Sequence, residues 1–457
     1  MEDTIVLYSS LAHLNSMLIL CKFFNKHHPT LPVTILSSTP ALESATTVIS
    51  SLPSVTYHRL PPAVAPHNLN KNPVELLFEI PRLNNPNLRQ ALLQISEKSR
   101  IRAIVIDFFC NAAFDVSTDL GIPTYFYVSS GAFFLCVLFH FPTIDEKIGQ
   151  QDLGSLNDFV EVPGCPPIYS SYFPPDMLFR RSPTYQHFLS TANNMRRSAG
   201  IVVNSFDALE SRAKEALVSG ACVPGGGPTP PAYLVGPLVV KAAAGGGGSG
   251  SDRHECLQWL DAQPCQSVVF LCFGRRGLFS AEQLKEMAVG LENSGHRFLW
   301  SVRSPVGVSE VPDLEALLPD GFLERTKGRG FVIKSWAPQT EVLDHKAVAG
   351  FVTHCGSSSM LEALIRGVPM ITWPIDAEQR MNKVFMVEEM GVGLPLEGWD
   401  NGFVAAAELE KRVKELMDTK AVRERVGEMR RAAEAAVGEG GSSVSDLNRF
   451  VATVTRD

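Results

Sequence analysis

A chain of 457 residues, of which 45% are hydrophobic, is long enough for two domains, because a single hydrophobic core seldom grows beyond about 250–300 residues. Its net charge of −7 and the lack of any Lys/Arg-rich run exclude nucleic acid as the expected partner. No apolar run approaches the ~18 residues of a membrane span, so we expect a globular protein without one.

The N-terminus and the cysteines indicate the compartment. The first residues, MEDTIVLYSS, carry two acids where a secretory signal has basic residues, so we expect neither a signal peptide nor a transit peptide. The nine cysteines form no CxxC pair and no metal-type spacing with histidine, which indicates reduced, mostly buried thiols and no metal site. We therefore expect a cytoplasmic protein, and a monomer.

The first half of the chain alternates short apolar runs with helical patterns. After the run at 4–10, Leu14, Met17 and Leu18 fall at the spacing of one helix face. Further runs rich in Val, Ile and Phe lie at 33–38, 103–109, 122–130 and 232–240. This alternation predicts an α/β domain with a doubly wound, Rossmann-like parallel sheet over residues 1–240.

A Gly/Ser-rich segment at 241–252 is typical of a flexible linker. Its glycines match the GxGxxG pattern of dinucleotide-binding loops, but no apolar-periodic helix follows them. The first strand-like run leads into YSSLAHLNS, which contains no glycine. A nicotinamide oxidoreductase, the natural rival for two Rossmann-like domains, is therefore disfavoured.

The alternation resumes after the linker and predicts a second parallel-sheet domain over 253–440. Its strand-like runs lie at 267–274, 297–302, 330–336, 349–356, 368–374 and 391–396. Ser280 and Gln283 have capping-box spacing at the start of one helix. A last helix at 441–457 can pack on either domain, including back on the first. Because ligands of open α/β sheets bind beyond the carboxyl ends of the strands, two such domains predict a site in the cleft between them.

The stretch FVTHCGSSSMLEALIRGVPMITWP, residues 351–374, contains a candidate anion site. Gly356 permits close backbone approach, and the helix that follows offers unpaired amides to which the hydroxyls of Ser358 and Ser359 add donors. The same spacing also fits a capping box between Ser359 and Glu362, and by itself it favours that alternative.

Neighbouring strand ends supply further polar groups. Trp336 and Gln339 follow one predicted strand, and Glu378 and Gln379 follow another. Together these groups suit a nucleotide sugar: they comprise an aromatic ring, an amide, an anion-binding helix start and side chains that can hold sugar hydroxyls. For Trp336 alone, a half-buried aromatic residue at a strand end is an equally good explanation.

The segment 336–379 resembles the signature of plant UDP-dependent glycosyltransferases in length and in nearly every landmark, and HLNSM, VNSFDALE and YLVGPL extend the resemblance over the whole chain. The resemblance implies a GT-B fold, with two facing Rossmann-like domains, the acceptor on the first and the UDP-sugar on the second. It implies that Trp336 stacks on uracil and that Gln339 and Glu362 hold the ribose. It also implies that His354 and Ser359 hold the diphosphate and that Glu378 and Gln379 hold sugar hydroxyls. Ala337 and Gly356 join this set as donor-binding residues.

For catalysis the resemblance implies a histidine base held by an aspartate, and the matching residues are His13 and Asp107. Both follow predicted strands, so both are expected at the carboxyl edge of the sheet. A neutral imidazole can take a phenolic proton, while the carboxylate fixes its tautomer and stabilises the imidazolium. Attack on the anomeric carbon then inverts the sugar, and neither a metal nor a cofactor is implied.

Two departures bear on the donor sugar. Ser357 and Ser358 stand where family members that use UDP-glucose generally have Trp-Asn, and Arg275 and Arg276 stand in a turn that usually carries a small hydroxyl residue. The pattern resembles the lineage of flavonoid 7-O-glucuronosyltransferases and chalcone 4′-O-glucosyltransferases of the mint and snapdragon order. Glucuronosyl members typically have arginine where this chain has Ser357, which suits a sugar carboxylate.

Our hypothesis is that the small Ser357 admits UDP-glucuronate, with Arg275 or Arg276 supplying charge and Ser129 or Ser130 contacting the sugar; UDP-glucose is the alternative donor. The lineage implies a flavonoid acceptor, attacked at its 7-hydroxyl. The phenylalanines at 108, 109, 133 and 134 suit a flat phenol and suit plain core equally well. Transfer to carbon would use the same base, whereas a UDP-sugar sensor would not need His13 beside Asp107.

Overall fold

The computed structural model describes residues 2–10, 12–37, 49, 52, 54–63, 72–225, 229–240, 253–274, 277–305 and 311–456. Contacts divide the chain into two compact units, which we describe one at a time. Unit 1 contains Met1–Val239 with Ala433–Asp457, and unit 2 contains Val240–Ala432. The segment 241–252 lies outside the described residues, so the domain boundaries given above stay predictions.

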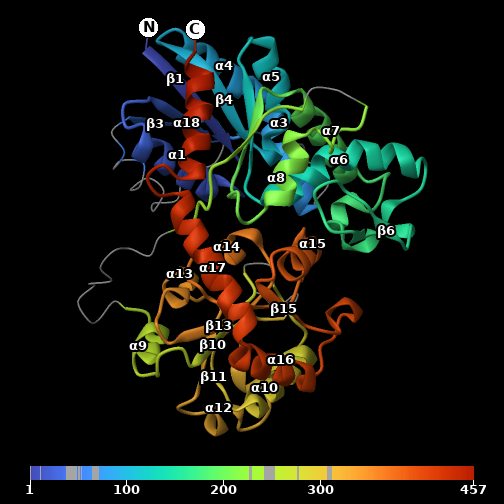
Figure 1. Cartoon of the computed structure of the whole chain (residues 1–457), viewed down its shortest axis with the longest axis vertical. Coiled ribbons are helices and arrows are strands. Elements are labelled where there is room, and N and C mark those ends of the chain that lie inside the picture. The colour runs from blue at the N-terminus through green and yellow to red at the C-terminus, as the bar shows by residue number, and fades with distance from the viewer. Residues whose placement is uncertain are drawn as a thin grey trace. The chain divides into compact units, whose positions relative to one another are not determined.

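Unit 1 is built on a seven-stranded, wholly parallel sheet of order β3-β2-β1-β4-β5-β8-β9 (Figure 1). The strands are β1 (Glu2–Ser9), β2 (Val33–Ser37), β3 (Val55–Arg59), β4 (Ser99–Asp107), β5 (Thr124–Val128), β8 (Gly200–Val203) and β9 (Ala232–Leu234). The helices are α1 (Leu14–His27), α3 (Pro73–Leu83), α4 (Asn85–Ser96), α5 (Ala113–Asp119), α6 (Ala132–Ile148), α7 (Pro183–Arg197), α8 (Ser211–Val218) and α18 (Ser442–Thr455). A short antiparallel pair, β6 (Phe159–Val160) and β7 (Ile168–Tyr169), lies apart from this sheet.

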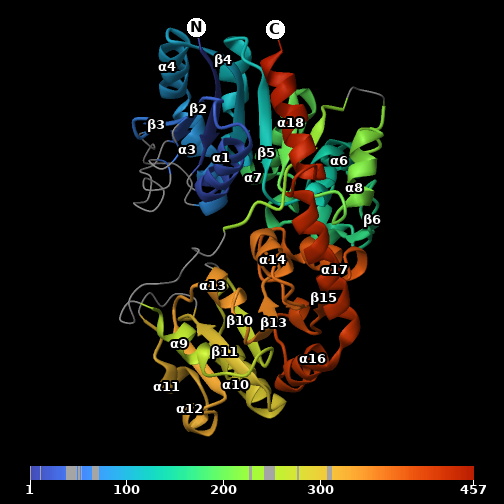
Figure 2. The ribbon, with the colours of Figure 1, turned by 60° about the vertical axis from the view of Figure 1, so that its left-hand side comes forward.

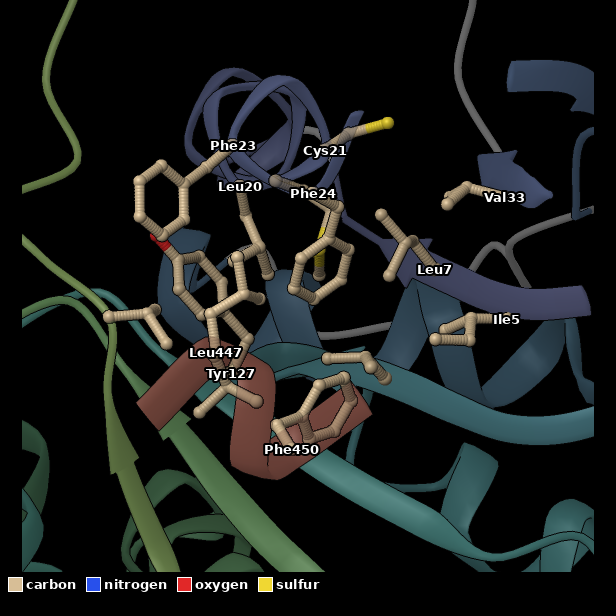
Figure 3. Close-up of a cluster of buried hydrophobic side chains, with 14 of the residues drawn as sticks. Ile5, Leu7, Leu20, Cys21, Phe23, Phe24, Val33, Tyr127, Leu447 and Phe450 are labelled. Carbon is tan, nitrogen blue, oxygen red and sulfur yellow. The ribbon is translucent and has the colours of Figure 1, made fainter. Parts of the chain in front are cut away.

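One face of the unit 1 sheet is covered by α1 and α18, elements from the two ends of the chain (Figure 3). Ile5 and Leu7 of β1 face these helices, and Phe24 of α1 stacks on Phe450 of α18 with ring centroids 5.6 Å apart. The predicted helix face is confirmed, because Leu14, Met17 and Leu18 are all buried in α1. The apolar residues at both ends of the chain therefore hold this core together.

Unit 2 is built on a six-stranded parallel sheet of order β12-β11-β10-β13-β14-β15 (Figure 2). The strands are β10 (Val268–Cys272), β11 (Arg297–Val302), β12 (Gly330–Lys334), β13 (Val348–Thr353), β14 (Met370–Thr372) and β15 (Gly393–Pro395). The helices are α9 (Glu255–Asp261), α10 (Ala281–Ser294), α11 (Leu314–Leu317), α12 (Phe322–Arg325), α13 (Gln339–Leu343), α14 (Ser357–Leu364), α15 (Gln379–Val384) and α16 (Ala406–Asp418). A further helix, α17 (Lys420–Ala436), runs from unit 2 into unit 1.

The predicted fold class, two Rossmann-like α/β domains with parallel sheets, is confirmed, and each strand-like run of the sequence forms a strand. Within the two parallel sheets, β3 and β8 were not predicted, and neither was the separate pair of β6 and β7. β3 is an edge strand with mostly polar, partly exposed residues, so it lacks an apolar run. β8 is a fully buried run of four residues, GIVV, which is as long as or longer than other strands that the sequence did predict.

The capping box predicted at α10 forms only in half. The Ser280 hydroxyl accepts a hydrogen bond from the Gln283 amide at 3.2 Å. The Gln283 side chain instead exchanges two hydrogen bonds with the backbone of Val404, at 2.9 and 2.8 Å. A long-range partner thus replaces the local one. In the described part of the chain, no helix has the length and apolar character needed to cross a bilayer.

Candidate active site

The predicted catalytic pair, His13 and Asp107, meets at the carboxyl edge of the unit 1 sheet. Asp107 is the last residue of β4, and His13 precedes α1, which follows the adjacent strand β1. His13 Nδ1 lies 3.0 Å from Asp107 Oδ1. The Asp107 side chain is fully buried, whereas a quarter of the His13 side chain is exposed. The geometry therefore places a carboxylate behind an accessible imidazole.

Asp107 is held as a carboxylate by its surroundings. Its oxygens accept hydrogen bonds from the amides of Ser10, at 2.6 Å, and Phe109, at 2.7 Å. Burial alone would raise the pKa of Asp107, but His13 and these hydrogen bonds outweigh it and lower the pKa below its ordinary value. An ionised Asp107 accepts the Nδ1 proton of His13, so the lone pair of the neutral ring is on Nε2. His13 can then act as a general base through Nε2.

An aromatic cluster lies beside His13. The ring of Phe109 is 4.9 Å from that of His13, and Phe78 of α3 follows 5.0 Å beyond Phe109. Phe109 is partly exposed, as a residue that contacts a flat acceptor must be. Phe133, by contrast, is 1% exposed and belongs to the core. The expectation of an acceptor-contacting phenylalanine therefore suits Phe109 and not Phe133.

Ser129 and Ser130 follow β5, at the same sheet edge as the catalytic pair, and both are partly exposed. The start of the next helix, α6, is in contact with a buried carboxylate, that of Glu210, which the sequence did not predict. Glu210 accepts hydrogen bonds from the amides of Ala132 and Phe133, each at 2.8 Å. A carboxylate 77 and 78 residues away along the chain thus occupies the start of α6, which leaves no place there for a diphosphate.

Unit 2 contains a cavity of about 350 Å³ at the carboxyl ends of β10, β11 and β12. Six residues predicted to bind the donor line it: Trp336, Ala337, Gln339, His354, Ser358 and Ser359. The Trp336 side chain is 66% exposed, so its ring is accessible for stacking on a base. The structure therefore brings residues from four separate chain segments to one concave surface.

Gln339 connects the two helices α13 and α14, which lie beside each other at one end of the sheet (Figure 2). Its Nε2 donates to Ser359 Oγ at 3.0 Å and to Glu362 Oε2 at 2.9 Å. Glu362 is largely buried, which raises its pKa, and the hydrogen bond from Gln339 opposes that rise. This network fixes the Glu362 carboxylate and the Ser359 hydroxyl relative to Gln339.

The alternative that Ser359 and Glu362 form a capping box is wrong. α14 begins after Gly356, so Ser359 is its third residue, and no side chain caps this helix among the described residues. The first amides of α14 are thus available to an anion, in contrast to those of α6. The local spacing suggested a capping box, but Ser359 and Glu362 each accept a hydrogen bond from Gln339 instead.

His354 lies at the start of this helix between two glycines. A Cβ atom on Gly274 would stand 2.8 Å from His354 Nε2, and one on Gly356 would stand 2.6 Å from it. Burial lowers the pKa of His354 to about 4, and its Nδ1 is buried without a partner in the described residues. The imidazole is therefore neutral near pH 7, so it offers a diphosphate a hydrogen bond and no positive charge.

We expect that binding of UDP-glucose does not tighten when the pH falls from about 8 to about 5.5. A histidine with its ordinary pKa, about 6.5, would become cationic in this window and attract the diphosphate. His354, with its pKa lowered to about 4, gains no charge there. Calorimetric titration across the pH range measures the effect, and a tightening of more than ~3-fold would contradict a neutral His354.

The remaining predicted donor residues lie outside the described lining of the cavity. Ser357 is 8% exposed, and its hydroxyl donates to Glu378 Oε1 at 3.2 Å. Gln379 Oε1 accepts from the amides of residues 375 and 376, so only its amide nitrogen is left to meet a sugar hydroxyl.

Arg275 and Arg276 lie outside the described residues. Arg303, which lines the cavity after β11, was missed, although the rule that ligands bind at strand ends applies to it.

Known proteins resemble this chain over almost its whole length. A family model described as UDP-glucoronosyl and UDP-glucosyl transferase matches residues 244–432. The chain is 56% identical to baicalein 7-O-glucuronosyltransferase of Scutellaria baicalensis, over 96% of this chain and 100% of that protein. It is 45% identical to anthocyanidin 5,3-O-glucosyltransferase of a Rosa hybrid cultivar, over 98% of each. The structure of Phytolacca americana UGT2 complexed with UDP-2fluoro-glucose and pterostilbene matches with a TM-score of 0.84 and 34% identity, over 99% of this chain and 100% of that one.

The two parallel sheets and the likeness to the Phytolacca americana structure define a glycosyltransferase of the GT-B class. The chain belongs to the plant UDP-glycosyltransferase family, which confirms the resemblance found in the sequence. The predicted UDP-sugar chemistry is confirmed at this level. The assignments of individual residues stay proposals, developed below.

Proposed function

We propose that this protein transfers glucuronic acid from UDP-glucuronate to the 7-hydroxyl of a flavonoid. The observation that carries the proposal is the 56% identity, along almost the whole chain, to a relative named baicalein 7-O-glucuronosyltransferase. The small Ser357 supports it, because a serine leaves room at the position where glucose-using members generally have an indole. The nine cysteines, all free thiols, suit a reducing compartment, and we propose the cytoplasm.

In the proposed reaction, Nε2 of His13 takes the proton of the acceptor hydroxyl as the oxygen attacks the anomeric carbon of the sugar. The bond between that carbon and the phosphate oxygen breaks, and UDP leaves with the electron pair. Because attack and departure occur on opposite faces, an α-linked donor gives a β-glycoside. Asp107, 3.0 Å from Nδ1, stabilises the imidazolium that forms.

Unit 2 is proposed to hold the donor. Trp336 and Ala337 bind uracil, and Gln339 and Glu362 bind the ribose. The amides of α14 from Gly356 onward, with Ser358, Ser359 and neutral His354, donate hydrogen bonds to the diphosphate as it takes up negative charge. Glu378 and Gln379, and Ser129 or Ser130 of unit 1, are proposed to meet the sugar. Arg275 stays a further proposed contact for the sugar carboxylate.

UDP-glucose is the second candidate donor, and one contact favours it. Ser357 Oγ donates to Glu378 Oε1 at 3.2 Å, which places a carboxylate beside the position expected to face the end of the sugar. A carboxylate repels the charged C6 group of glucuronate but not the hydroxyl of glucose. The relative named anthocyanidin 5,3-O-glucosyltransferase is consistent with this alternative.

Competition between the two donors tests the proposal. The enzyme is given equal UDP-glucuronate and UDP-glucose with a trihydroxyflavone such as apigenin, and the products are separated by mass to obtain the ratio of kcat/KM values. We expect the glucuronide to predominate, with the sugar on the 7-oxygen by NMR. If the glucoside predominates, UDP-glucose is the donor and the second candidate is established. If no product forms with either donor, this acceptor class is rejected.

A further inference from the structure

One residue of the turn between β13 and α14 has a backbone conformation that its type disfavours. Cys355, the second residue after β13, has a φ of 65°, in the left-handed region that favours glycine. It is fully buried, while its neighbour Gly356, which could adopt this φ readily, has a φ of −66°. Strain of this kind persists only where the surrounding structure imposes it. Contacts around Cys355 must therefore hold the turn in this shape.

Asn382 of α15 supplies one of these contacts from outside the signature segment 336–379. Its Nδ2 donates to the carbonyl oxygen of Cys355 at 2.9 Å, and only 5% of the residue is exposed. On the other side of Cys355, the hydroxyl of Thr353, the last residue of β13, accepts from the Cys355 amide at 3.3 Å. Buried side chains thus fix the peptide groups before and after Cys355, and Asn382 ties the second of them to another helix.

The hydrogen bond from Asn382 sets the direction of the Gly356 amide. The peptide bond between Cys355 and Gly356 is trans, so its C=O and N–H point in opposite directions, and the N–H points away from Asn382. Within the described part of the chain, this N–H donates to no other group. The first amides of α14 follow it directly, and no side chain there caps them. The strained turn therefore keeps a run of amides available at the helix start.

We propose that Asn382 is a positioning residue for the diphosphate of the UDP-sugar. It holds Cys355 in the left-handed conformation and so directs the amide of Gly356 and the first amides of α14 toward phosphate oxygens. This inference rests on the proposed assignment of this helix start to the diphosphate, and it adds a residue that acts through the backbone and not on the ligand. His354 depends on the same turn, since a Cβ atom on Gly356 would stand 2.6 Å from its Nε2. An amide side chain suits the task because it donates to a buried carbonyl without placing a charge beside it.

Calorimetric titration with UDP and with uridine tests the proposal. Asn382→Leu keeps the size of the side chain and removes the hydrogen bond. We expect it to weaken UDP binding by about 10-fold, because misdirected amides lose charge-assisted hydrogen bonds to phosphate. Uridine makes none of these hydrogen bonds, so it should bind within ~2-fold of its wild-type affinity. If the leucine variant does not fold, Asn382→Ser, whose hydroxyl is too short to reach the carbonyl, should show the same split. Equal losses for both ligands, or no loss for either, would overturn the proposal.

A double-mutant cycle tests whether the conformation of Cys355 is the cause. Glycine adopts a φ of 65° readily, so in the Cys355→Gly protein the turn depends less on Asn382. In this background we expect Asn382→Leu to weaken UDP binding by less than ~3-fold, against about 10-fold in the wild-type background. An equal effect in both backgrounds would mean that Asn382 does not act through Cys355, and the proposal would be wrong.

Gln283→Met is the matched control. Gln283 also carries a buried amide of unit 2, and its Nε2 donates to the Val404 carbonyl at 2.9 Å, but it is not among the described residues that line the donor cavity. This variant should lower the melting temperature and leave the ratio of UDP to uridine affinity unchanged. A changed ratio would show that any lost buried hydrogen bond produces the split, which would overturn the proposal. A wild-type protein that binds UDP no more tightly than uridine would instead overturn the assignment of the helix start to the diphosphate.

Discussion

Replacing His13 by alanine is expected to lower kcat for a phenolic acceptor by at least ~100-fold, the usual contribution of a positioned general base. The side chain is a quarter exposed, so its loss leaves no large cavity, but it removes a partner of the buried Asp107 carboxylate, so the melting temperature should fall as well. UDP should bind as before, because the donor cavity is lined by residues of unit 2. Steady-state kinetics with calorimetric titration of UDP measures both quantities.

Asp107→Asn should produce a loss of at least ~100-fold as well, because an amide cannot both accept the Nδ1 proton and stabilise the imidazolium. It should also lower stability, since the carboxylate accepts the amide hydrogens of Ser10 and Phe109. The sign follows from its lowered pKa: the contribution of Asp107 to stability is present above the ordinary pKa of aspartate and is lost as the pH falls through the lower folded value.

His345→Ala is the matched control for the catalytic pair. His345 also pairs with an aspartate, its Nε2 lying 3.1 Å from Asp261 Oδ1, but neither residue lies in the candidate site. We expect near-normal turnover from this variant. If His13→Ala also retained near-normal turnover, the assignment of His13 as the base would be wrong, and a search for another proton acceptor near Phe109 would follow.

The second large effect is expected at residue 357, where Ser357→Arg should shift the ratio of kcat/KM values toward UDP-glucuronate by about 10- to 100-fold. A charge-assisted hydrogen bond to the C6 carboxylate is worth about 1.5–3 kcal/mol, and each 1.4 kcal/mol is a factor of ten. The serine is 8% exposed at the start of α14, so the longer side chain must extend toward Glu378 and the space beyond it. An arginine there also neutralises the Glu378 carboxylate, which removes a repulsion from the acidic donor.

Two further variants separate charge from bulk at this position. Ser357→Leu adds volume without charge and should slow both donors without favouring glucuronate. Ser357→Ala removes the hydrogen bond to Glu378 and should change the ratio by less than ~5-fold, as expected for a single neutral hydroxyl. A Ser357→Arg variant with an unchanged ratio would mean that residue 357 does not face the end of the sugar, and donor choice would have to come from elsewhere.

Much of the donor site could be predicted from local sequence. Trp336, Gln339 and His354 each follow a strand-like run, and the carboxyl ends of neighbouring parallel strands meet at one edge of a sheet. The pattern of runs therefore suffices to bring these residues together before any coordinates are known. The same reasoning applies to His13 and Asp107, since His13 follows β1 and Asp107 is the last residue of the adjacent strand β4. Arg303 directly follows β11, so the same rule applies to it.

Other features depend on partners distant in sequence. Gln339 reaches Ser359 and Glu362, which a local pattern assigned to a capping box. Glu210 occupies the start of α6 from another part of the chain, so of the two helix starts, only that of α14 keeps its amides available to a diphosphate. Side-chain hydrogen bonds of this kind depend on packing. Their donor and acceptor are too far apart in the chain to fall within one short stretch of sequence.

By itself, then, the sequence determined the two parallel sheets, the edge at which each site lies and the residue types that gather there, because strand periodicity and chain order fix these features. Only the tertiary structure decided the chemical state of those residues. Burial makes His354 neutral, the surrounding amides keep Asp107 ionised, and packing places Arg303 against the turn that faces His354. Charge states and cavity walls follow from desolvation and from contacts between distant segments, and both come into existence only when the chain is folded.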